Sequence, residues 1–153
     1  MGRFGPVVNS ANAYVTALIF CEKVITEART GLDTLVSAFE RLQVQTLPSR
    51  MPQFFVYVAI ARGESDESEF YFAIISPNGE VVVKGGFRVE NWGALHWSAF
   101  ILPLAEVPLP TAGLYVVRVF APDRVLMERY IDVRISPQSP AGQDNSPTSE
   151  PSP

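Results

Sequence analysis

The chain has 153 residues, of which 47% are hydrophobic, so it is long enough to bury one core and short for two independent domains. Its net charge is −4, and its 12 Lys and Arg residues are scattered along the chain. This distribution disfavours a nucleic acid as the main partner, because nucleic-acid binders concentrate basic residues on one surface. From the length of the chain, we expect one domain.

The first apolar run spans residues 13–21 (AYVTALIFC). It is much shorter than the roughly 20 residues that cross a bilayer, and no small-residue cleavage site follows it. We expect no membrane association, a cytoplasmic protein, and a flexible N-terminal segment over residues 1–12. Cys21 is the single cysteine, so an intrachain disulfide is excluded, and we expect it to be a small buried hydrophobe.

The next apolar segment, residues 32–42, is ambiguous from its residues alone. Its apolar positions at 32, 35, 36, 39 and 42 fit the spacing of a helix, with Asp33 as a candidate N-cap. Hydrophobic periodicity therefore leaves helix and strand both open here.

Alternating apolar residues dominate the middle of the chain. Residues 54–61 (FFVYVAIA) predict a strand inside a sheet, because both of its faces are apolar. Residues 70–84 (FYFAIISPNGEVVVK) predict a hairpin around an Asn-Gly turn. The pair Gly85-Gly86 predicts a bulge after it.

The acidic loop at residues 64–69 (ESDESE) lacks the ligand spacing and the glycine of a calcium-binding loop. We interpret it as a solvated loop that keeps one end of the sheet soluble.

Both tryptophans of the chain lie in the next segment, and four residues there are candidate ligand-binding residues. A Trp face beside polar groups on a loop can stack on a sugar ring, and Gly93 lies within the same stretch. The competing interpretation places Trp97 in the core and Trp92 as a cap on the end of the fold. The candidates are Asn91, Trp92, His96 and Trp97.

His96 is the only histidine, so a multi-histidine metal site cannot be built, and we expect no Ser-His-Asp triad around it. We predict no catalytic residue, no metal site, no cofactor-binding residue and no cofactor.

The last predicted strands are residues 97–102, which Pro103 ends, and a hairpin over residues 114–133 (LYVVRVFAPDRVLMERYIDV). Residues 137–153 contain five Pro and four Ser and lack the apolar surface to pack. We predict a disordered tail there and a folded domain over residues 13–136.

Several sequence features, taken together, resemble those of an uncharacterised bacterial β-sandwich family, a domain of unknown function. They include the strand ending at Cys21, Gly31, the Ser37-Ala38-Phe39 triplet, SPNGEVV and the LPLP segment before residues 112–115. The triplet has Ser37 where we would expect Gly. The resemblance implies strands at residues 14–20 and 34–42, joined across Thr30 and Gly31.

The sequence thus predicts an all-β fold: a single antiparallel β-sandwich of about 7–8 strands, immunoglobulin-like or C2-like. We expect a non-enzymatic interaction or scaffold module that binds a protein partner or forms a homodimer through its sheet edges. The alternative function is a carbohydrate-binding module that uses Trp92 and Trp97.

Overall fold

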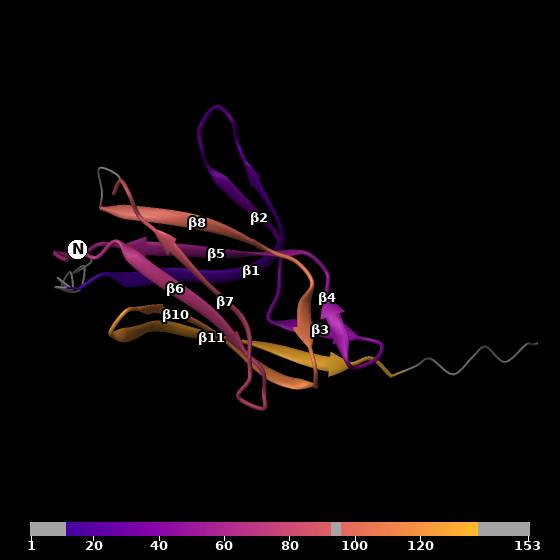
Figure 1. The fold of residues 1–153 in the computed structure, drawn as a ribbon. Helices are drawn as coiled ribbons and strands as arrows, with labels where there is room; N and C mark the ends of the chain where they lie inside the picture. The colour runs from indigo at the N-terminus through magenta and orange to yellow at the C-terminus, as the bar shows by residue number, and fades with distance from the viewer. Residues whose placement is uncertain (1–11, 93–95, 138–153) are drawn as a thin grey trace, which may run out of the picture.

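The computed structural model describes residues 12–92 and 96–137, and its regular structure within these ranges consists of strands. Two larger sheets, ordered β2-β1-β5-β8 and β3-β11-β10-β6-β7, form two layers, and β4 pairs with β9 at one end (Figure 1). In chain order the strands are β1 (Tyr14–Thr26), β2 (Asp33–Ala38), β3 (Arg41–Val44), β4 (Ser49–Met51), β5 (Phe54–Ala61), β6 (Glu69–Ile75), β7 (Val81–Arg88), β8 (Trp97–Leu104), β9 (Val107–Leu109), β10 (Gly113–Ala121) and β11 (Arg124–Ile135).

The core lies between the two layers, because alternate residues of the long strands are apolar and turn toward the facing sheet. Phe20 and Val58 from the first sheet pack in one cluster with Phe70 and Val117 from the second, and each is at most 1% exposed. Burying such a side chain is worth about 1.5–3 kcal/mol, so these inward-facing residues hold the layers together.

Strand β5 lies in the interior of the first sheet, as its two apolar faces predict, with β1 on one side and β8 on the other. Cys21 of β1 pairs both with Phe55 of β5 and with Ala38 of β2. Beyond Cys21, β1 pairs with β2 alone, and this hairpin projects from the sandwich as an arm (Figure 1). We call residues 22–37 the β1–β2 arm.

The ambiguous segment at residues 32–42 is β-structure, so the helical alternative is wrong. The expected single strand over residues 34–42 is also wrong in its extent, because it is divided into β2 and β3, which lie in different sheets. Ser37 has a φ of 53°, in the left-handed region where Gly is preferred, which is the position at which we expected Gly. The following residue, Ala38, still pairs with Cys21 in the first sheet, and the chain passes to the second sheet between Ala38 and Arg41.

Both expected hairpins are confirmed, as β6–β7 and β10–β11. The expected bulge at Gly85-Gly86 is misplaced, because the register of β6 and β7 shifts between Ile74 and Ile75 instead. A Cβ on Gly85 would lie 2.5 Å from Cε1 of Phe72 on the neighbouring strand. The glycine therefore makes room for an aromatic ring inside a regular strand.

Pro103 does not end its strand, contrary to the sequence prediction. Strand β8 continues to Leu104, and Pro103 pairs with Phe55 in the register of β5 and β8. A proline is tolerated within an edge strand where its nitrogen points away from the neighbouring strand.

The all-β class is therefore confirmed, and the finer prediction differs from the structure in two respects. The described residues contain eleven strands rather than seven or eight. Strand β3 runs parallel to β11, so the second sheet is mixed rather than purely antiparallel. Residues 1–11 and 138–153, which make up nearly all of the expected N-terminal segment and tail, lie outside the described residues. Among the described residues there is no helix that could cross a membrane.

The substitution Gly85→Ala should lower the free energy of unfolding by about 1–3 kcal/mol, because the added methyl group meets the ring of Phe72. Lys84→Ala, at the exposed neighbouring position, is the matched control and should change it by less than about 0.5 kcal/mol. Urea denaturation of both variants measures the difference. Equal stabilities would contradict the close packing of Gly85 on Phe72.

Candidate functional site

The outer face of the first sheet carries no charged side chain on β5, on β8 or on the part of β1 that pairs with them. On β8 the outward residues are Trp97, Ala99, Ile101 and Pro103, since their neighbours in sequence face the core. The outward residues of β5 and β1 are Phe55, Tyr57, Ala59, Ala61, Tyr14, Thr16, Ala17, Ile19 and Cys21. We call this surface the uncharged face.

Trp97 lies across the uncharged face. Its indole Nε1 donates a hydrogen bond to Oγ1 of Thr16 at 3.3 Å, and Thr16 in turn donates to the carbonyl oxygen of Ala59 at 3.2 Å. Because β5 separates β8 from β1, the indole spans the central strand, and 43% of Trp97 remains exposed. The interpretation that placed Trp97 in the core is therefore wrong.

Two titratable side chains on this face are held in their neutral forms. Burial raises the pKa of the Tyr57 hydroxyl, and the negative charge of Asp33 in the β1–β2 arm raises it further. Cys21 is fully buried, as expected, and burial raises the pKa of its thiol. Both shifts favour the uncharged form, so the face stays neutral near pH 7.

The outer face of the second sheet is different, because charges are interspersed on it. Arg118 of β10 and Glu128 of β11 form an ion pair at 2.6 Å, and Arg88 of β7 pairs with Glu69 of β6 at 2.7 Å. Mixed charges of this kind are typical of a sheet face that is exposed to water. The outer faces of the two sheets therefore differ in their charge.

The predicted ligand-binding residues do not form one surface. Trp92 packs edge-on against the core residue Phe70, with ring centroids 6.2 Å apart, whereas Trp97 lies on the uncharged face. Asn91 and His96 are exposed, and His96 has a φ of 54° at the entry to β8. Gly93 lies outside the described residues. Sugar binding by these residues stays a prediction.

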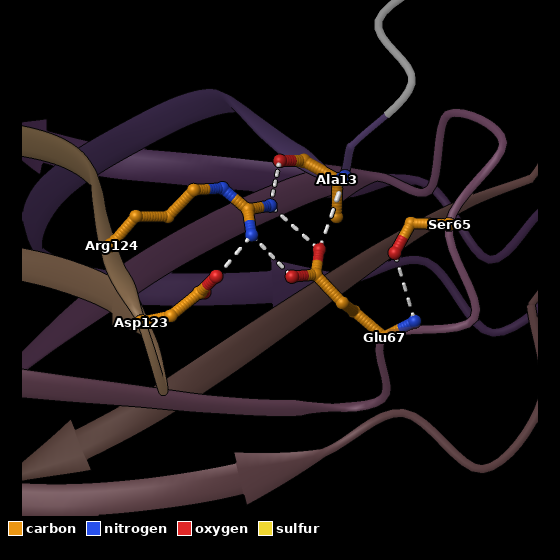
Figure 2. Close-up of polar contacts among 5 residues, drawn as sticks. All are labelled: Ala13, Ser65, Glu67, Asp123 and Arg124. Atoms are coloured by element: carbon orange, nitrogen blue, oxygen red, sulfur yellow. Dashed lines mark hydrogen bonds and ion pairs between the residues drawn. The ribbon is translucent and has the colours of Figure 1, made fainter.

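The acidic loop is not simply solvated, because Glu67 within it forms an ion pair with Arg124 at the start of β11 (Figure 2). Both side chains are about three-quarters buried, with 23% and 26% exposure. One guanidinium nitrogen of Arg124 donates to Glu67 Oε2 at 2.6 Å and to the carbonyl oxygen of Ala13 at 3.0 Å. The backbone N–H of Ala13 donates to Glu67 Oε2 at 3.3 Å.

This cluster joins three segments that are far apart in sequence: the start of β1, the acidic loop and the turn between β10 and β11 (Figure 2). Hydrogen bonding from Arg124 lowers the pKa of Glu67, and the same interaction raises the pKa of Arg124. We interpret it as a structural clamp, since each charge already has its partner.

Within residues 12–92 and 96–137, no three His, Cys, Asp or Glu side chains come together in a group that could hold a metal ion.

Sequence reasoning missed the uncharged face. Two features of the sequence indicate this face: residues 54–61 are apolar on both faces, and residues 97–104 contain no charged residue. By itself, the first observation predicts only that this strand lies inside a sheet.

The fold and this face define an all-β protein of two packed layers with one uncharged outer surface. The chain belongs to a family of unknown function (DUF6941), whose model matches residues 16–134. No curated protein sequence matches the chain. A solved structure of an immunoglobulin-like protein from Pseudomonas aeruginosa is similar, with a TM-score of 0.44 and 15% identity, covering 80% of this chain and 97% of that one.

The substitution Glu67→Gln should lower the free energy of unfolding at pH 7 by about 1–3 kcal/mol, because Arg124 loses a charged acceptor. The folded state holds the pKa of Glu67 below its usual range, so this stabilisation is present at neutral pH. The stabilisation begins to fall as the pH drops below about 4.3, the ordinary pKa of glutamate, and it is lost as the pH falls through the lower pKa of Glu67 in the folded state, where the two proteins converge.

Thermal denaturation from pH 7 to pH 3 measures this effect, with Glu64→Gln, an exposed position in the same loop, as the matched control. A Glu67→Gln variant as stable as the control at pH 7 would show that the clamp contributes nothing.

Proposed function

We propose that this chain is a non-enzymatic interaction module, an immunoglobulin-like or C2-like sandwich that binds another folded protein through its uncharged face. One observation carries the proposal: the outward residues of β5 and β8 and of the adjoining part of β1 include no charge, and several of them are large and exposed. Contiguous apolar surface of this kind is typical of protein interaction sites.

The chemistry of the face indicates the kind of partner. Trp97, Tyr14 and Ile101 are 43%, 42% and 36% exposed, and aromatic residues are enriched in the centres of protein interfaces. A partner that presents an apolar surface of its own would remove these side chains from water without leaving a charge unpaired. A cytoplasmic setting is part of the proposal, supported by a single cysteine that needs no oxidising compartment.

The substitution Ile101→Lys should reduce retention of partner proteins by at least about tenfold, because it places an ammonium group inside an apolar interface. Leu114→Lys is the matched control, since Leu114 is 55% exposed on the outer face of the second sheet. Affinity capture from the source cells, followed by mass spectrometry, compares both variants with the wild type. If all three retain the same proteins in equal amounts, the uncharged face is not the binding surface.

Sugar binding is a second proposal, supported by the exposed indole of Trp97 rather than by the Trp92 and Trp97 pair. Trp97→Ala should then abolish retention on a polysaccharide matrix and the quenching of Trp fluorescence by the soluble glycan. Trp92→Ala should instead lower the melting temperature, because Trp92 packs on Phe70. Glycan retention that is undiminished in the Trp97→Ala variant would exclude this role.

A further inference from the structure

The free edge of β8 borders the uncharged face. Strand β8 is the last strand of its sheet, and no described strand pairs with it on the side away from β5. Each of the other three terminal strands of the two large sheets carries at least one charge: Asp33 on β2, Arg41 on β3 and Lys84 on β7. Charges on edge strands oppose pairing with another chain, and β8 (WSAFILPL) has none.

The direction of the backbone groups of β8 follows from one hydrogen bond. The N–H of Arg62 donates to the carbonyl oxygen of His96 at 2.8 Å, and these two residues are directly opposite in the register of β5 and β8. Opposed residues of an antiparallel pair alternate between hydrogen-bonded and non-hydrogen-bonded pairs. The even-numbered residues of β8 therefore bond to β5, and the odd-numbered residues direct their N–H and C=O groups to the free edge.

Pro103 agrees with this assignment, because it is an odd-numbered residue whose missing N–H costs the β5 ladder nothing. Trp97, Ala99 and Ile101 are left as residues that offer both a donor and an acceptor at the edge. Their side chains all lie on the uncharged face.

This arrangement is self-complementary. If β8 pairs antiparallel with β8 of a second copy about a two-fold axis at Ala99, Ala99 lies opposite itself and Trp97 lies opposite Ile101 of that copy. Each of these pairs is of the hydrogen-bonded type, so each forms two N–H···O bonds. A two-fold axis at Phe100, one residue toward the C-terminus, would instead place Trp97 opposite Pro103, which has no N–H to donate.

The edge of β8 presents no charge of its own that would oppose a second copy. Each chain carries a net charge of −4, so two copies repel each other in general. Strand β8 itself contains no charged residue, and the pairing places two exposed apolar side chains, Trp97 at 43% and Ile101 at 36%, next to each other.

We propose that the protein forms a symmetric dimer in which β8 pairs antiparallel with β8 of a second copy about Ala99, producing one continuous eight-stranded sheet. This deepens the proposed function and rests on it, because the dimer joins the uncharged faces of two copies into one surface.

The test uses the purified full chain and charges at the two-fold axis. In sedimentation velocity at micromolar concentrations, the wild type and Leu114→Lys should be dimers. Ala99→Lys and Ala99→Glu should each be monomers, because like charges would meet at the axis. An equimolar mixture of these two variants should restore a dimer, since opposite charges would then face each other. A monomeric wild type, or a mixture that stays monomeric, would overturn the proposal.

Hydrogen exchange of the wild type gives a readout that needs no variant. The amides of Trp97, Ala99 and Ile101 should be protected in concentrated protein and lose protection on dilution, while those of Ser98 and Phe100 stay protected at both concentrations. Protection of all five amides that is independent of concentration would contradict the pairing. These measurements use no other protein, so failure of the dimer is distinct from failure of partner capture by the uncharged face.

Discussion

The position of β5 is the constraint on which the rest of the structure depends. This strand is hydrogen-bonded along both edges, to β1 and to β8, and its inward residues Val56, Val58 and Ile60 are fully buried against the facing sheet. Its outward residues are also uncharged. A central strand that is apolar on both faces needs a neighbouring strand at each edge, and it makes its part of the outer face of the sheet apolar as well.

The two ends of the sandwich are held by different interactions. At one end, the backbone N–H of Phe39 donates to Phe20 and that of Asp132 donates to Glu40, where the chain passes from β2 to β3, which runs parallel to β11 in the other sheet. At the other, Arg124 and Glu67 tie the start of β1 to the β10–β11 turn. The first depends on backbone hydrogen bonds and the second on a partly buried ion pair.

The uncharged face was only partly predictable. The sequence shows apolar residues on both faces of residues 54–61, and this pattern correctly predicts that β5 lies in the interior of its sheet. Which strand lies beside β5 depends on long-range pairing, and residues 97–104 are more than thirty positions away along the chain. The separation of Trp92 from Trp97 has the same origin. The two residues are five positions apart in sequence, yet Trp92 packs on the core residue Phe70 and Trp97 lies on the uncharged face.

The sequence by itself determined the all-β class, the two hairpins and the interior place of β5, because period-two alternation and turn residues act locally. Only the tertiary structure decided that residues 32–42 divide between two sheets, that Gly85 accommodates Phe72, and that Pro103 lies within an edge strand. Each of these depends on which strands are neighbours, and strand pairing is selected by packing between residues far apart in the chain.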